Sequence, residues 1–86
     1  MIVTKQAVAE RIAAHLQHRV TLPQLVDWAE NAMMDGEFDE SDAATISAVV
    51  ARLGVADVRA FGLTWTDCEE LLAKLGFSAR VEIVAA

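Results

Sequence analysis

The chain has 86 residues, 55% of them hydrophobic, and its 13 acidic and 7 basic residues give a net charge of −6. A chain of this length forms one domain, and its single cysteine excludes an internal disulfide, which is typical of a reducing cytoplasm. The negative charge disfavours nucleic acid and membrane surfaces, and no apolar run approaches the roughly 20 residues that cross a bilayer. We therefore expect one globular domain, residues 1–86, in the cytoplasm.

The first predicted helix covers residues 4–18. Thr4 is a suitable N-cap, because its hydroxyl can accept a hydrogen bond from the backbone of the first turn. Val8, Ile12 and Leu16 recur every four residues and would form one buried stripe. This spacing indicates an amphipathic helix.

The second predicted helix covers residues 22–34. Thr21 and Gln24 have the spacing of a capping box, in which each side chain binds the other residue's backbone amide. Gly36 follows the last turn, and we expect it to adopt the left-handed conformation that ends many helices. Both ends of this helix are therefore marked in the sequence.

The third predicted helix covers residues 41–52. Asp39 or Ser41 would cap its start, and Gly54 would end it. Because the connection from the second helix is short, we expect the second and third helices to form an antiparallel hairpin.

The fourth predicted helix covers residues 65–75. Two pairs of residues have the spacing of a capping box at its start, Thr64 with Asp67 and Thr66 with Glu69. Either pair would place the first turn of the helix within the same few residues.

The end of the chain changes character after Gly76. Gly76 followed by Phe77 predicts a Schellman ending, in which the apolar residue folds back on the last helical turn. Residues 77–84 then alternate between apolar and polar side chains, which favours a strand. The partner of this strand would be residues 55–61, which form either a strand or a helical turn, residues 2–4, or another protein chain.

The predicted fold class is mainly α (α+β), with about four short helices as packed hairpins and a small C-terminal β element. A lone strand leaves backbone groups unpaired at its edges. Residues 80–84, which begin with Arg80 and end with Val84, would therefore allow a homodimer by pairing with the same strand of a second copy.

Seven of the 13 acidic residues lie within residues 27–42, which contain no Lys or Arg and which we call the acidic segment. A calcium loop starting at Asp35 would need Gly at its sixth and Glu at its twelfth position, where Glu40 and Ile46 stand. The segment instead predicts attraction to a basic protein. The candidate partner-binding residues combine its carboxylates with two aromatic side chains: Trp28, Glu30, Asp35, Glu37, Phe38, Asp39 and Glu40.

His15 and His18 share one side of the first predicted helix. Zinc needs at least three protein ligands, and no further ligand pair accompanies these histidines. They join Arg11 and Arg19 on a weakly basic face, which would pair with the acidic segment either within the molecule or across a dimer.

The sequence contains no recognisable catalytic group. Cys68 would lie in the first turn of the fourth helix, and the negative charges of Asp67 and Glu69 beside it oppose a reactive thiolate, so we expect a packed core residue. No nucleophile has a base near it, and there is no glycine-rich phosphate loop. We therefore predict no catalytic residues, no metal, no cofactor and no enzymatic activity.

The leading functional prediction is a small acidic cytosolic protein-interaction module, an inhibitor, immunity-like protein or adaptor that binds a basic partner protein. The alternative is a DNA-binding regulator centred on residues 45–61, because residues 48–55 resemble the first helix and turn of a helix-turn-helix. That alternative requires Arg52 and Arg59 to be exposed on one face. Nucleic acid is the less favoured partner because of the net charge.

Overall fold

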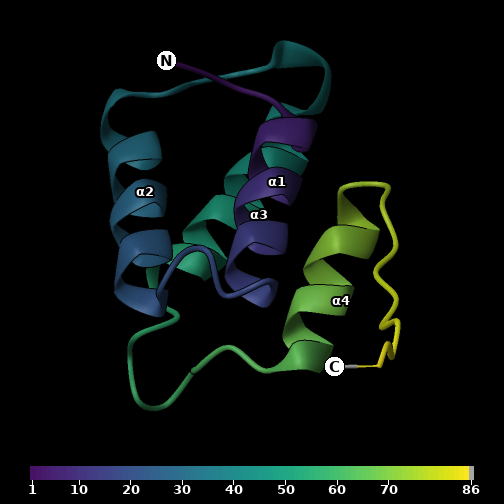
Figure 1. Ribbon diagram of the computed structural model, residues 1–86. Coiled ribbons are helices and arrows are strands. Elements are labelled where there is room, and N and C mark those ends of the chain that lie inside the picture. Colours follow the sequence, from purple (N-terminus) through teal and green to yellow (C-terminus); the bar gives the residue numbers. More distant parts are fainter. Residues whose placement is uncertain (86) are drawn as a thin grey trace.

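The computed structural model describes residues 1–85 and shows a mainly helical protein (Figure 1). Its elements follow in the order β1 (Ile2–Val3), α1 (Lys5–Leu16), α2 (Leu22–Asp35), β2 (Glu37–Phe38), the 3-10 helix η1 (Glu40–Asp42), α3 (Ala43–Gly54) and α4 (Trp65–Lys74). The four predicted helices are thus confirmed, each with ends shifted by no more than a few residues.

Local capping determines where α1 begins and ends. The Thr4 hydroxyl accepts a hydrogen bond from the amide of Ala7 at 3.1 Å, as predicted. The helix ends at Leu16, earlier than expected, because His18 adopts a left-handed conformation with φ 61°. The Arg19 amide then turns back to the carbonyl of Ala14 at 2.9 Å.

The helices α2 and α4 begin with the capping boxes that the sequence predicts. In α2 the Thr21 hydroxyl accepts from the Gln24 amide, and the Gln24 side chain accepts from the Thr21 amide. In α4 the capping pair is Thr64 with Asp67. Thr66 takes no part in capping.

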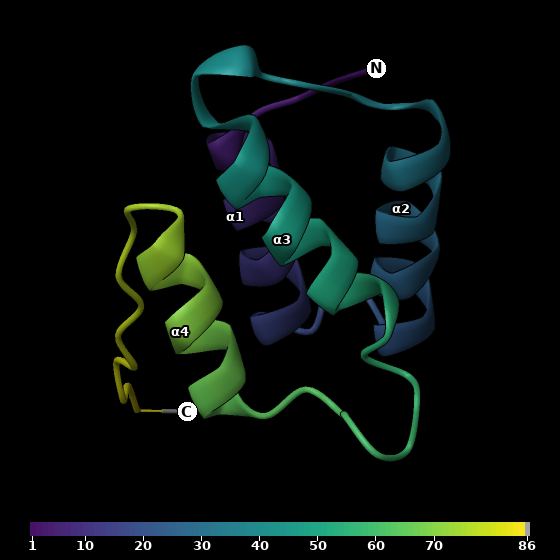
Figure 2. The same ribbon diagram turned by 180° about the vertical axis from the view of Figure 1, so that it is seen from behind.

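The core lies between α2 and α3, which form the most extensive helix contact, and α1 and α4 complete it (Figure 2). Each helix contributes apolar side chains to one buried cluster. The largest completely buried side chains include Ile12, Leu25, Ile46, Leu53 and Leu75. Since every helix buries one face here, each needs the others for its stability.

The β structure is not where the sequence analysis placed it. β1 pairs in parallel with β2, so that Ile2 lies opposite Glu37 and Val3 opposite Phe38. Residues 77–85 form no strand. Val3 is completely buried and so fixes the first strand to the core, whereas the residues after Phe77 meet no other strand within the chain. Within residues 1–85 the strands are therefore N-terminal, and the predicted C-terminal β element is not confirmed.

The connection between α2 and α3 is also more elaborate than the short hairpin turn we expected. It contains β2 and η1, and the Asp39 carboxylate accepts from the Ser41 amide at 3.1 Å to cap η1. Gly36 has an extended conformation with φ −81°, so the left-handed prediction is wrong. A Cβ atom at Gly36 would meet the Ala32 carbonyl and would lie 2.9 Å from Val3 Cγ2. Glycine is required here by close approach.

Residues 55–61 form neither of the predicted structures but a succession of turns. The predicted Schellman ending of α4 is confirmed: Gly76 has φ 88°, and the Phe77 amide donates to the Leu72 carbonyl at 2.9 Å. The residues that follow run back along α4 (Figure 1). Among residues 1–85 no helix has both the length and the apolar character to cross a membrane.

Candidate protein-interaction surface

The carboxylates of the acidic segment gather largely at one end of the molecule. The last turn of α2, β2, η1 and the first turn of α3 lie at this end together with the N-terminus, at the top of Figure 1. Four of the five predicted carboxylates are exposed, and only Asp39 is partly buried, because it caps η1. The exposed ones are Glu30, Asp35, Glu37 and Glu40.

Little positive charge neutralises these groups. Within residues 1–85 the segment forms one ion pair, between Lys5 Nζ and Asp42 Oδ1 at 3.5 Å. The N-terminal ends of α1 and α3 lie at the same end of the molecule (Figure 1). Their dipoles favour negative charge and so explain part of the clustering without a partner.

The two predicted aromatic anchors lie against the core. Trp28 is partly buried, and the guanidinium carbon of Arg11 stands 5.4 Å from its ring centroid, which is a cation–π distance. Phe38 is partly buried in β2 beside Val3. Neither ring is fully available to a partner, although each keeps one accessible part.

More exposed apolar side chains lie at this end, and the sequence analysis missed them. Met34, in the last turn of α2, is 73% exposed, and Ile2, opposite Glu37, is 69% exposed. Met34 falls outside the apolar stripe of α2, so its exposure could have been predicted from the sequence. The neighbouring sequence does not predict that Ile2 lies on this surface, because its position depends on the β1–β2 pairing.

Within residues 1–85 the basic face forms no ion pair with a carboxylate of the acidic segment. Arg11 covers Trp28, and Arg19 donates to the Gln17 side chain at 2.7 Å and 3.0 Å. His15 Nδ1 lies 3.2 Å from the Val20 carbonyl oxygen. Within residues 1–85 no three His, Cys, Asp or Glu side chains come together in a way that could hold a metal ion.

Cys68 is a core residue, as predicted. It is 1% exposed, and its burial raises the pKa of the thiol, with a further rise from the charge of Asp67. The pKa of Asp67 itself is lowered, first by hydrogen bonds from the Thr64 amide and hydroxyl and then by Arg52. The start of α4 thus holds a buried thiol with a raised pKa beside a carboxylate with a lowered pKa.

The region considered for DNA binding lacks a recognition helix. Residues 55–61 form turns, and Arg52 is engaged inside the molecule through Gly62 and Asp67. Only Arg59 of the two required arginines is exposed.

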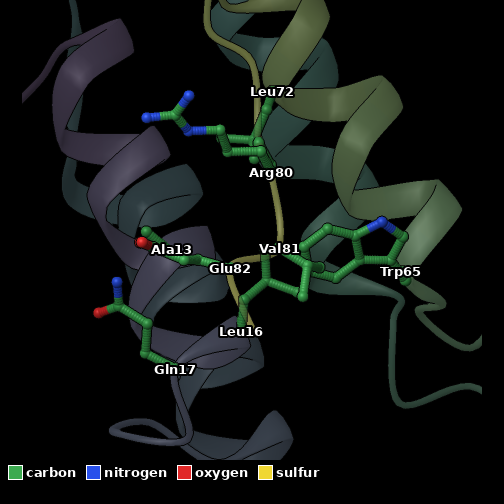
Figure 3. A pocket seen from close by; sticks show the side chains of 9 residues that line it. Ala13, Leu16, Gln17, Trp65, Leu72, Arg80, Val81 and Glu82 are labelled. Carbon is green, nitrogen blue, oxygen red and sulfur yellow. The ribbon is translucent and has the colours of Figure 1, made fainter. Parts of the chain in front are cut away.

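A shallow pocket of about 490 Å³ lies between α1 and α4 and is closed on one side by the C-terminal residues (Figure 3). Its lining is mainly apolar, with Leu16 from α1 and Trp65 and Leu72 from α4. Val81 projects into the same space (Figure 3). The pocket contains no pair of groups suited to acid–base chemistry.

Comparisons with protein families, with curated proteins and with solved structures found no match to this chain. A proposal of function therefore rests on the geometry of the described residues alone.

Proposed function

We propose that this protein is a cytoplasmic interaction module, acting as an inhibitor or adaptor, whose acidic end binds a basic protein. The contact surface consists of the exposed carboxylates Asp35, Glu37 and Glu40 around the apolar side chains of Met34 and Ile2. The other predicted residues, Trp28, Glu30, Phe38 and Asp39, would support or flank it.

The single observation behind this proposal is that exposed carboxylates and exposed apolar side chains meet at one end of the molecule. Met34 is followed directly by Asp35, and Ile2 stands opposite Glu37 across the sheet. Apolar groups at the centre of an interface supply most of its affinity, whereas charges around them steer the encounter. Both components are present here.

The charge also specifies the kind of partner. A surface with several carboxylates and one nearby ion pair repels other anions and attracts Lys- and Arg-rich surfaces. Attraction of this kind acts over about 10 Å at 0.1 M salt and weakens as salt is added. Association should therefore slow steeply with ionic strength, whereas dissociation should depend mainly on Met34 and Ile2.

The test is capture of a partner from the source cell's lysate at low salt, followed by elution with a salt step and identification by mass spectrometry. The test variant is Asp35→Asn with Glu37→Gln. The matched control is Glu69→Gln with Glu70→Gln, which removes the same charge from exposed positions on α4. We expect a basic protein to be retained by the wild type and the control but lost by the test variant.

Two results would overturn the proposal. One is equal retention of the partner by the test variant and the control, because the position of the carboxylates would then make no difference to capture. The other is binding that does not change between low and high salt. With the partner identified, Met34→Ala should raise its dissociation rate and leave the salt dependence of association unchanged.

A further inference from the structure

Residues 78–85 run back along α4 without pairing with a strand of the chain, and they carry exposed apolar side chains (Figure 1). Within residues 1–85 no backbone amide or carbonyl of residues 78–85 forms a hydrogen bond, and the last such bond is donated by the Phe77 amide. Ile83 is 93% exposed, Val84 74% and Val81 69%. Exposed β-branched residues on an unpaired backbone are the features of an open strand edge.

The order of charges in this segment is self-complementary. Arg80 and Glu82 are two residues apart, so in an extended strand they lie on one face, with Val81 and Ile83 on the other. Turning the segment through a twofold axis at Val81 exchanges the positions of the positive and the negative residue. A second copy therefore offers the charge pattern that this segment needs.

We propose that two copies of the protein join through these segments as antiparallel strands centred on Val81. In this register Arg80 lies opposite Glu82 of the partner subunit, and the symmetry repeats the pair, giving two ion pairs. Val81 lies opposite the partner's Val81, and Ala79 lies opposite the partner's Ile83. Opposite charges across neighbouring strands stabilise a sheet, whereas like charges destabilise it.

The same charges exclude the neighbouring arrangements. An antiparallel register centred on Arg80 or on Glu82 places like charges directly opposite each other, and so does parallel pairing in register. A shift by one residue mixes the charged and apolar faces, because side chains alternate with period two. Among these arrangements, only the antiparallel register centred on Val81 places both charged residues opposite residues of the other sign.

The pocket between α1 and α4 would support the ribbon. A two-stranded ribbon alone is marginally stable in water and needs a hydrophobic surface to pack on. Ala79 already packs against the core, and Val81 lines the pocket beside Leu16 and Trp65 (Figure 3). Arg80 and Glu82 line the same pocket, so residues 79–82 as a whole lie along this mainly apolar surface in each subunit.

The test is the oligomeric state of the full chain, measured by sedimentation equilibrium over a range of concentrations. We expect a dimer whose dissociation constant rises about tenfold or more in Arg80→Glu and in Glu82→Arg, because each change creates like-charged pairs. The double variant R80E/E82R restores opposite charges and should restore the dimer. Both side chains are exposed, so circular dichroism should show an unchanged fold.

A second measurement tests the register directly. Val81→Cys should form a disulfide between subunits under mild oxidation, whereas Ser78→Cys, placed away from the axis, should not. The buried Cys68 should not contribute. A wild-type chain that stays monomeric, single variants that dimerise like the wild type, or a charge-swapped variant that stays monomeric would overturn the proposal.

Discussion

Arg52 on α3 donates a hydrogen bond from Nη2 to the carbonyl oxygen of Gly62 at 3.0 Å. The same nitrogen lies 3.4 Å from Asp67 Oδ2, and the guanidinium stands 5.8 Å from the ring centroid of Phe61. One side chain thus connects α3, the loop after it and the start of α4. The loop is thus tied to both helices through this arginine.

Replacing Arg52 by lysine should loosen this loop. Lysine keeps the charge but lacks the planar fork that contacts Gly62 and Asp67 together, so we expect a loss of about 1–2 kcal/mol in the free energy of unfolding. Urea denaturation measures this loss, and limited proteolysis should cut the loop faster. Arg59→Lys, at an exposed position of the same loop, is the control. Equal stability of the two variants would contradict the role of Arg52.

Gly36→Ala should destabilise the protein by about 2 kcal/mol, because its Cβ would collide with the Ala32 carbonyl and with Val3. Gly54→Ala provides the comparison. There the new Cβ would meet only Met33 Cε at 2.8 Å, the free end of a flexible side chain that is able to move. Thermal unfolding of both variants should show a lower melting temperature for Gly36→Ala alone. A loss of similar size in both would mean that close approach is not the reason for Gly36.

Asp67 should make stability depend on pH in acid. Its pKa in the folded protein lies below the ordinary value of 3.8, because its carboxylate accepts hydrogen bonds from Thr64. The ionised form therefore stabilises the fold above about pH 3.8, and this contribution is lost as the pH falls through the lower folded value. Asp67→Asn should reduce the urea midpoint at pH 7, and the difference from the wild type should shrink below pH 3.8. Glu69→Gln, an exposed change in the same turn, should show no such convergence.

Removal of the N-cap hydroxyl in Thr21→Ala should cost about 1 kcal/mol, because the Gln24 amide loses its acceptor. Thr66→Ala removes a hydroxyl that caps nothing, and it should change the free energy of unfolding little. Chemical denaturation of the two variants compares them directly. A loss in Thr66→Ala as large as that in Thr21→Ala would contradict the capping role of the Thr21 hydroxyl.

The helices were predictable because their signals are local. A capping box such as Thr21 with Gln24 involves residues of a single turn, and the structure contains the box that their spacing predicts. The Schellman ending at Gly76 is equally local. For such features the sequence within a few residues contains all the interacting groups.

The sheet was not predictable in this way, because strand pairing depends on distant parts of the chain. Residues 77–84 have a stronger strand pattern than Ile2–Val3, yet the latter pair because α1 and α2 bring them beside Glu37–Phe38. Gly36 illustrates the same point, since part of the space that a side chain would need there is occupied by Val3, which is distant in the sequence.

The candidate surface was predictable in its charge but not in its apolar part. Charge clustering is visible in the sequence, and Glu37 and Glu40 are exposed as expected. The exposure of an apolar side chain depends on packing. Here Trp28 contacts Arg11, whereas the side chain of Met34 is exposed to solvent.

The parallel pairing of β1 with β2 also affects the order in which parts of the fold form and open. It joins segments separated by two whole helices, so it forms only after α1 and α2 have come together, and it should open before the rest of the fold. The amides of Glu37 and Asp39 donate to Met1 and Val3 at 2.7 Å and 3.0 Å. The exchange of these two amide hydrogens with solvent therefore reports on the acidic end alone, and a bound partner would slow it while leaving the helical core unchanged.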